Sequence, residues 1–319
     1  MSTYRTVKGY SIKKVTGDPS NPKEGQVWYN STEQKIKARL TIAAAFSCGG
    51  NLPANKSDGA GAGTLTAGLQ FGSVRVPNSP NTGGLSTQNA TNEYDGSSWT
   101  AGGNMNTGRA TFGGTGTQTA ALAFGGRITN NPFTYTANSE EYNGSSWTEG
   151  NNLGATMSAG GILIPGGASA KTQEYDGSSW SEVNAAPANL SRVAGAGTQT
   201  AAVFTGNQSG ADAVYLYDGT NWTVSPATSG DLNSRTFTGT QTAGLAVGGG
   251  PGSTASELWN GTTFSTDAVL STARQAHMAS TNATQAANYV CGGNNPGTKL
   301  NSTEEYTGVA EGTRGFDVS

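Results

Sequence analysis

Two short motifs recur six times in phase along the chain, and this repetition constrains the fold more than any other feature. The first motif is Glu-Tyr-Asp-Gly-Ser-Ser-Trp or a close variant, and the second is a Thr/Ala-rich run that ends in glycine. Repeats of about 40–50 residues are typical of architectures in which each copy is one supersecondary unit that packs against its neighbours. The leading aromatic residues of the first motif are Tyr94, Tyr142, Tyr175, Tyr217, Trp259 and Tyr306. The second motif occupies residues 64–72, 117–126, 159–167, 198–206, 240–249 and 284–293.

A second aromatic residue closes the first motif in every copy except the last. The copy at Tyr306 lacks it, but the segment from Phe46 to Leu52 aligns with the segment from Trp99 to Met105 at an offset of 53 residues. Phe46 therefore supplies the missing anchor. Unequal spacing between constant motifs indicates loops of unequal length on a fixed core. The predicted blade anchors are Phe46, Trp99, Trp147, Trp180, Trp222 and Phe264.

Each motif predicts a local structure. Asp-Gly or Asn-Gly between two apolar segments predicts a hairpin with a type I′ turn, in which both central residues have positive φ. The Ala-rich run that ends in glycine predicts an inner strand with small side chains, where neighbouring sheets crowd around an axis. Ten to thirteen residues after most anchors, a basic residue opens the next strand, and Met157 replaces it in the third repeat. These basic residues are Lys56, Arg109, Arg192, Arg235 and Arg274.

Four strands per repeat is the pattern of a β-propeller. With strands a to d counted from the axis outward, each repeat runs d, a, b, c along the chain. The chain then starts with strand d around Phe46 and ends with strand c around Tyr306. Pairing of these two strands would close the ring and remove the open edges that invite aggregation. The sequence predicts an all-β, six-bladed β-propeller of four-stranded blades, with seven blades as the alternative.

Composition agrees with an all-β chain. Glycine accounts for 48 of the 319 residues, and each glycine inside a helix costs roughly 1 kcal/mol, so long helices are not expected. The hydrophobic fraction of 34% is low for a globular core. Disorder is nevertheless not expected, because disordered chains combine few aromatic residues with strong net charge. Here the net charge is only -3, and the chain has 6 Trp, 11 Tyr and 9 Phe.

Charge divides the chain near residue 40. Residues 1–39 carry a net charge of +5 and residues 40–319 a net charge of -8, and such a break in composition marks a boundary. Within residues 17–40, Val27-Trp28-Tyr29 is followed by a polar turn and by Lys35-Ile36-Lys37. This pattern predicts a hairpin-like element. We expect a basic N-terminal arm over residues 1–40 and a propeller over residues 41–319.

Few residues are available for catalysis. His277 is the only histidine, so neither a Ser-His-Asp triad nor a histidine metal cluster is expected. Cys48 and Cys291 are expected to be packing residues rather than a redox pair. A glycosidase needs two carboxylates about 5–9 Å apart, and no non-repeated pair stands out. We predict no catalytic residue, metal or cofactor. The glutamates that precede strand c tyrosines are predicted to be solvated edge charges: Glu140, Glu141, Glu304 and Glu305.

Binding is better supported than catalysis. The connections between strands b and c vary most, and variable loops on a rigid scaffold often carry recognition. They span residues 73–91, 127–139, 168–172, 207–213, 251–256 and 294–302. The second of these loops offers side chains suited to stacking on sugar rings and bonding their hydroxyls, although a solvated irregular loop is the alternative. These candidate ligand-binding residues are Arg127, Asn130, Asn131, Phe133 and Tyr135.

The motifs resemble those of known families. The order Arg, Gly-Gly, Tyr, Trp resembles the kelch repeat over residues 46–308. The arm GDPSNPKEGQVWYNST resembles one found in structural proteins of tailed bacteriophages, notably marine ones that infect cyanobacteria. In those proteins it precedes Gly-rich, kelch-like repeats of the same type. The resemblance implies a virion component, such as a tail fibre, receptor-binding or surface decoration protein, whose arm docks to the particle while the propeller faces outward.

Three classes of function follow. The first is a non-enzymatic virion protein that binds other virion proteins through residues 1–40 and a host-surface glycan or protein through the propeller. The second is a propeller glycosidase or depolymerase, and the third is a kelch-type interaction scaffold. Nucleic-acid binding is not expected because the ring is acidic. The sequence has no apolar stretch for membrane insertion and no signal peptide, which predicts synthesis in the host cytoplasm. Fibre proteins are commonly trimeric, so a homotrimer is possible.

Overall fold

The computed structural model describes residues 12–75, 86–130, 132–154, 170–188, 193–205, 213–225, 234–250, 252–295 and 298–317. All regular structure in these residues is β-strand, as predicted. The described part of the chain has no helix with the length and apolarity to cross a membrane. The chain forms two compact units. The larger unit is Ala45–Thr307, and the smaller unit combines Met1–Ala44 with Gly308–Ser319.

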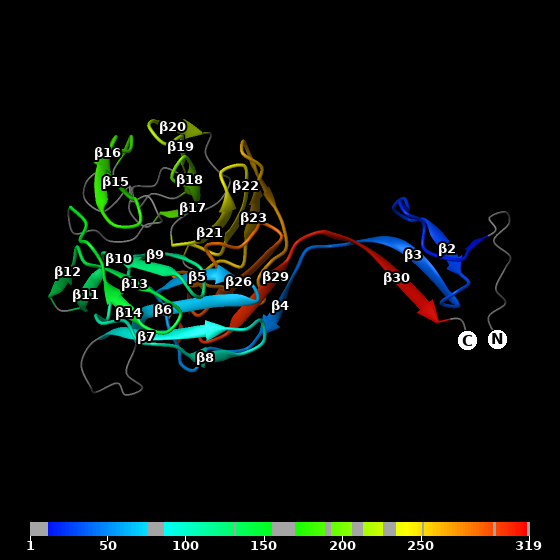
Figure 1. Cartoon of the computed structure of the whole chain (residues 1–319), viewed down its shortest axis with the longest axis horizontal. Coiled ribbons are helices and arrows are strands. Elements are labelled where there is room, and N and C mark those ends of the chain that lie inside the picture. Colours follow the sequence, from blue (N-terminus) through cyan, green and yellow to red (C-terminus); the bar gives the residue numbers. More distant parts are fainter. Residues whose placement is uncertain are drawn as a thin grey trace. The chain divides into compact units, whose positions relative to one another are not determined.

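The larger unit contains six small antiparallel sheets that correspond to the six repeats (Figure 1). Sheet 1 is β5 (Ala60–Thr64), β6 (Ala67–Arg75), β7 (Ser86–Tyr94) and β8 (Trp99–Ala101). Sheet 2 is β9 (Gly113–Gly116), β10 (Ala121–Phe124), β13 (Ser139–Tyr142) and β14 (Trp147–Glu149). Sheet 3 shows β15 (Thr172–Tyr175) and β16 (Trp180–Val183) among the described residues.

The remaining sheets follow the same strand order. Sheet 4 is β17 (Ala194–Thr198), β18 (Ala201–Thr205), β19 (Val214–Tyr217) and β20 (Trp222–Ser225). Sheet 5 is β21 (Thr236–Thr240), β22 (Ala243–Val247), β23 (Ser256–Trp259) and β24 (Phe264–Thr266). Sheet 6 is β25 (Met278–Ala279), β26 (Ala287–Cys291), β29 (Thr303–Thr307) and β4 (Ala45–Gly49). Two short hairpins lie outside these sheets, β11 (Arg127–Asn130) with β12 (Phe133–Tyr135) and β27 (Asn294–Asn295) with β28 (Thr298–Lys299).

Sheet 6 joins the two ends of the repeat region. β4 is antiparallel to β29, and Phe46 lies opposite Tyr306, as the aligned motifs predict. β29 also separates the two cysteines, because Cys48 is on β4 and Cys291 on β26. Cys291 is buried but Cys48 is exposed, so only one of them packs in the core.

Each repeat places two aromatic rings in contact across its third and fourth strands. Tyr94 lies opposite Trp99, and their ring centroids are 4.7 Å apart. The same pair occurs in the other repeats, including Phe46 with Tyr306 at 5.1 Å. Of the predicted anchors, Trp99 and Trp147 are buried and the other four are half-buried. The more deeply buried partner is usually the aromatic residue of the third strand, such as Tyr94 at 0% exposure.

The turn within this motif differs from the type I′ turn that the sequence predicts. Gly96 has a φ of 92°, but Asp95 is not among the described residues with positive φ. The register of Tyr94 with Trp99 leaves a four-residue connection. The Asp95 carboxylate caps it by accepting the backbone N–H groups of Ser97 and Ser98 at 2.8 and 2.7 Å. These bonds, led by the one from Ser98, lower the pKa of Asp95 to about 2.

The first strands of neighbouring sheets pack closely on one another. β5 contacts β9, β17 contacts β21, β21 contacts β25, and β25 contacts β5. Small residues make this approach possible. A Cβ atom on Gly61 would lie 2.2 Å from the carbonyl oxygen of Ala279, and one on Gly114 would lie 2.5 Å from the Cβ of Ala60. The Gly- and Ala-rich composition is therefore used where these strands meet.

Buried ion pairs hold the segment before the first strand to the third strand of the same sheet. Arg109 pairs with Glu140 in sheet 2, and both side chains are at most 2% exposed. Arg274 with Glu304 is the equivalent pair in sheet 6, and in sheet 5 Arg235, three positions later relative to the first strand, pairs with Glu257. The prediction that Glu140 and Glu304 are solvated edge charges was wrong. They lie two residues before the third-strand aromatic residue and therefore share its buried face.

The glutamate one residue before the tyrosine faces the next sheet. Tyr142 of sheet 2 donates to Glu93 of sheet 1 at 2.6 Å, and Tyr217 of sheet 4 donates to Glu174 of sheet 3 at 2.9 Å. Burial, and then the bond to Glu93, raise the pKa of Tyr142 to about 12. The predicted solvated role was also wrong for Glu141 and Glu305, which are half-buried and join neighbouring sheets. They accept hydrogen bonds from Tyr175 and Tyr94 respectively.

The smaller unit is a four-stranded sheet in the order β1 (Lys13–Val15), β2 (Val27–Asn30), β3 (Lys35–Ile42) and β30 (Ala310–Asp317). The predicted hairpin is β2 with β3. Trp28 is fully buried and donates to Asp18, whose other carboxylate oxygen lies 2.7 Å from Lys37 Nζ.

The division of the chain differs from the predicted ranges of 1–40 and 41–319. The boundary lies after Ala44, and residues from Gly308 onward belong to the smaller unit. The reason is that β30 pairs with the whole length of β3, from Ile42 opposite Ala310 to Lys35 opposite Asp317.

Candidate functional site

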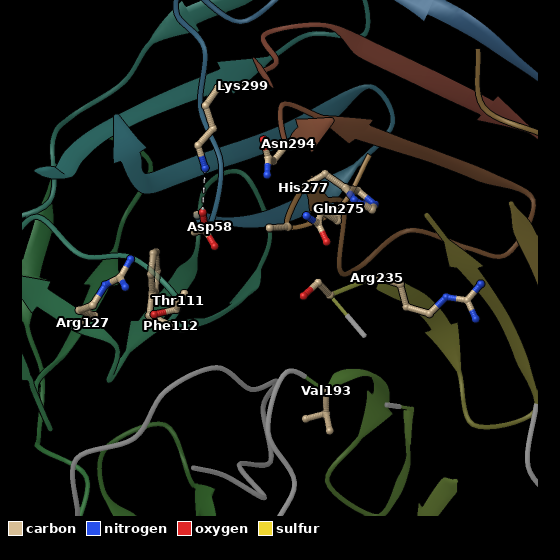
Figure 2. A pocket seen from close by; sticks show the side chains of 13 residues that line it. Asp58, Thr111, Phe112, Arg127, Val193, Arg235, Gln275, His277, Asn294 and Lys299 are labelled. Atoms are coloured by element: carbon tan, nitrogen blue, oxygen red, sulfur yellow. Dashed lines mark hydrogen bonds and ion pairs between the residues drawn. The ribbon is translucent and has the colours of Figure 1, made fainter. Parts of the chain in front are cut away.

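A pocket of about 380 Å³ lies where the first strands of five sheets begin (Figure 2). We call it the central pocket. Its volume is within the range of small-molecule binding sites. Most of its residues precede a first strand, and the others follow a second strand. The lining residues are Asp58, Gly59, Thr111, Phe112, Arg127, Val193, Ser234, Arg235, Gln275, Ala276, His277, Asn294 and Lys299.

Four lining residues share an unusual backbone conformation. Asp58, Thr111, Ser234 and Ala276 have φ values of 60°, 48°, 56° and 50°, and each occupies the same place before its first strand. Backbone hydrogen bonds link them in series. Thr111 N–H donates to Asp58 at 2.7 Å, Asp58 N–H to Ala276 at 2.9 Å, and Ala276 N–H to Ser234 at 2.9 Å. Left-handed conformations of non-glycine residues cost about 1–3 kcal/mol each and concentrate at functional sites.

Charged side chains of both signs line the central pocket. Lys299 Nζ lies 3.4 Å from Asp58 Oδ2, and Figure 2 shows the two side chains facing each other. Lys299 also donates to Ser57. Arg235 is buried and pairs with Glu257 at 2.8 Å. These two cations therefore have carboxylate partners in the larger unit.

Arg127 connects the central pocket to the loop that the sequence predicts as a ligand-binding candidate. It begins β11, and its guanidinium carbon lies 4.7 Å from the centroid of the Phe133 ring on β12. Phe133 is 60% exposed and Tyr135 is 41% exposed. Asn130 belongs to β11, but its side chain and the whole of Asn131 lie outside the described residues. The structure thus brings Arg127 and Phe133 together and places Arg127 on the pocket wall.

His277 lies on the wall of the central pocket and is 5% exposed. Its Nε2 is 2.8 Å from the Thr236 hydroxyl, and its Nδ1 is buried without a hydrogen-bond partner. Burial, followed by the positive charges of Arg274 and Arg235, holds the pKa of His277 well below its usual value. The imidazole is therefore neutral near pH 7 and can act as a hydrogen-bonding group.

A smaller cavity of about 140 Å³ adjoins the central pocket and shares five lining residues with it. Its wall is formed mainly by the first strands, with Gly and Ala positions and the side chains of Phe112, Phe237 and Met278. This cavity is less polar in residue type than the central pocket. The two cavities together therefore combine a charged wall with a wall rich in Gly and Ala.

Sequence reasoning identified only part of this site. Arg127, Asn294 and Lys299 fall in loops that the sequence marks as variable. The positive-φ residues were missed because no glycine marks their conformation. A signal was present for Asp58, Thr111 and Ala276, since each follows a repeated basic residue by two positions. The only histidine, which had no predicted ligand role, also lies on the pocket wall.

Comparison with known proteins bears on the fold and not on the ligand. The sequence matches no protein-family model and no curated protein. The fold is similar to that of YjhT. The alignment has a TM-score of 0.58 and 14% sequence identity, and it covers 82% of this chain and 95% of YjhT. At this identity YjhT supports a propeller-type all-β architecture and no shared activity.

Proposed function

We propose that this protein is a non-enzymatic structural component of a tailed-bacteriophage virion. In this proposal the smaller unit docks to other virion proteins, and the larger unit is displayed for recognition of the host surface or for decoration of the particle. The arm motif within residues 17–32 motivates the phage assignment. The host-surface ligand we favour is a glycan.

The observation that carries the proposal is the division of the chain into two compact units. The segments that flank the larger unit on both sides belong to the smaller unit, so the polypeptide enters and leaves the larger unit through it. Lys13 and Lys14 on β1 are exposed there and belong to the basic segment. The larger unit contains a polar pocket on a rigid scaffold, which is the arrangement expected of a recognition unit.

We also infer that the larger unit is a closed, six-bladed propeller of kelch-like blades. The pairing of β4 with β29 and the contacts between first strands of neighbouring sheets support this inference. The step from sheet 2 to sheet 3 is supported by the contact between Phe124 and Trp180, and the step to sheet 4 by the bond from Gln199 to the Tyr175 carbonyl. An experimental density map viewed along the axis would count the blades, and a seventh sheet would overturn the inference.

The docking part is tested by charge reversal on the exposed edge of the smaller unit. Lys13→Glu with Lys14→Glu should reduce incorporation into particles produced in an infected host, as measured by mass spectrometry of purified particles. Lys171→Glu is the matched control, because Lys171 is an exposed lysine of the larger unit. Both variants should keep the unfolding midpoint of the native chain. Wild-type incorporation of the double variant would rule out docking through this edge.

A propeller glycosidase is less well supported by the site. Asp58 is the one carboxylate among the described residues that line the central pocket, and it faces Lys299. Glycoside hydrolysis by the common mechanisms uses two carboxylates on one site. Release of reducing sugar from host polysaccharide by the purified chain would favour the enzyme over the display protein.

A further inference from the structure

We propose that the central pocket binds a small hydroxylated ligand through an oxyanion, a carboxylate or a phosphate, with Arg127 as the principal cation. The inference rests on the proposed function in one respect: it takes the larger unit as the recognition unit. It does not depend on docking of the smaller unit to a particle.

The charges of the pocket wall do not balance. Arg127, Arg235 and Lys299 carry three positive charges on the lining. Asp58 faces Lys299, and Glu257 pairs with Arg235. In the described part of the larger unit no carboxylate pairs with Arg127, and its Nε is buried without a hydrogen-bond partner. The wall therefore has one cation in excess, and a concave site of one sign attracts ligands of the other.

The Arg127 side chain is arranged for planar recognition. Its guanidinium packs on the Phe133 ring, which limits the orientations of the group. A guanidinium offers a fork of N–H donors that matches the two oxygens of a carboxylate or phosphate. Among the described residues no side chain forms an ion pair with this guanidinium, and Arg127 lines the central pocket.

A second observation, independent of charge, also indicates a ligand. His277 is more than nine-tenths buried on the wall, and its Nδ1 has no partner. A buried nitrogen without a hydrogen-bond partner is destabilising, and a ligand group that reached it would supply the missing bond. The wall also presents hydroxyl and amide groups that suit the hydroxyls of a sugar-like molecule. These groups belong to Thr111, Ser234, Gln275 and Asn294.

The size of the site limits the ligand. A volume of about 380 Å³, with about 140 Å³ in the adjoining cavity, accommodates a molecule of one or two sugar units. The adjoining cavity, lined largely by Gly and Ala, would accept an apolar face of that molecule. We therefore expect a sugar acid or sugar phosphate, free or at the end of a longer glycan.

Calorimetric titration of the full chain with glucuronate, inorganic phosphate and glucose tests the inference. Glucuronate and glucose differ at one carbon, so their comparison isolates the carboxylate. Arg127→Gln should weaken glucuronate binding roughly 10- to 100-fold, the range expected for a charge-assisted hydrogen bond. Lys171→Gln is the matched control and should leave binding unchanged. Gln275→Glu is isosteric and adds a negative charge to the pocket wall, so it should also weaken glucuronate binding. It replaces Arg127→Gln as the test variant if Arg127→Gln does not fold.

Asp58→Asn should act in the opposite direction. It removes the negative charge that faces Lys299, and asparagine tolerates the left-handed conformation of this position. Tighter glucuronate binding by Asp58→Asn together with weaker binding by Arg127→Gln supports the proposal. Equal binding by wild type and Arg127→Gln overturns it, as does failure of both anions to bind at roughly 10 mM.

Two results would separate this inference from the proposed function. If glucose binds as tightly as glucuronate, the proposal that the pocket recognises an oxyanion is wrong. The proposal that the larger unit recognises a glycan would still stand. Normal anion binding by a chain that never enters particles contradicts virion docking and supports the pocket assignment.

Discussion

Sheets 1 and 2 fill the same buried position in two different ways. In sheet 2, the buried Arg109 guanidinium pairs with Glu140, which also accepts backbone N–H groups from the preceding loop. In sheet 1, Lys56 Nζ donates to Gln70 at 2.8 Å, and Asn92 at the position of Glu140 donates to the same oxygen at 2.7 Å. A charged pair in one sheet is thus replaced by a lysine with two amides in the other.

In these two sheets the buried basic residue keeps hydrogen-bonding partners although the residue types around it differ. Removing one member of a buried ion pair leaves an uncompensated charge, whereas exchanging both members can be nearly neutral. Sheet 3 has two uncharged residues at these positions in sequence, Gln173 at the position of Glu140 and Met157 at the position of Arg109. Met157 itself lies outside the described residues.

Truncation of the same position in both sheets should give the largest difference between them. Glu140→Ala should lower the free energy of unfolding by about 3–5 kcal/mol, because Arg109 would stay buried without its partner. Asn92→Ala should cost only about 1–2 kcal/mol, the value of neutral hydrogen bonds. Urea unfolding of the two variants measures the difference. Equal losses of unfolding free energy would show that the ion pair contributes no more to stability than the neutral hydrogen bonds.

The lysine of sheet 1 adds a pH dependence that Arg109 does not share. Burial lowers the pKa of Lys56 to about 8 from 10.5. Between these values the unfolded chain binds the proton and the folded chain does not, so the stability contributed by Lys56 rises with pH, by up to about 1.4 kcal/mol per pH unit. It is complete above pH 10.5 and is lost as the pH falls through 8.

Urea unfolding of wild type and Lys56→Met at pH 7.5 and 9.5 separates the pH-dependent contribution of Lys56 from that of the other titrating groups. The stability of wild type relative to the variant should increase at the higher pH. A difference between the two proteins that does not change with pH would contradict a neutral buried amine.

The smallest change in stability is expected at the turn between the third and fourth strands, which both sheets cap in the same way. Asn143 of sheet 2 accepts the same turn N–H groups as Asp95 of sheet 1, at 3.0 and 2.9 Å. Asp95→Asn keeps the hydrogen bonds of the turn and should therefore change stability at pH 7 less than either Glu140→Ala or Asn92→Ala. Wild type has a contribution from Asp95 that is present above pH 3.8 and lost as the pH falls through about 2, and the variant should lack it. Acid unfolding monitored by circular dichroism compares them.

The repeated part of the fold was predictable because its motifs are local. Strand order, the aromatic pairs and the partnership of Phe46 with Tyr306 all follow from the alignment of short motifs. β30 was missed because residues 310–317 carry no repeat motif, and their partner β3 is about 270 residues away. A pattern within one segment does not identify a partner so distant in sequence.

The buried glutamates and the pocket residues were not predictable for different reasons. A glutamate before a tyrosine looks solvated until the partner arginine, some 30 residues earlier for Glu140, is known to share its face. The pocket depends on left-handed positions such as Thr111 and Ala276, whose residue types do not favour that conformation. Tertiary contacts impose it, so sequence alone gives no signal of the conformation itself.

Pairing of β3 with β30 makes the polypeptide between them a tethered loop. If β4 separates from β29 while the smaller sheet stays intact, the two strands are still joined through a short covalent path on each side, since β3 ends at Ile42 and β4 begins at Ala45. Their effective concentration then stays high, and re-pairing competes well with capture of a strand from another molecule. The smaller sheet should therefore protect against domain swapping and make opening at this junction reversible.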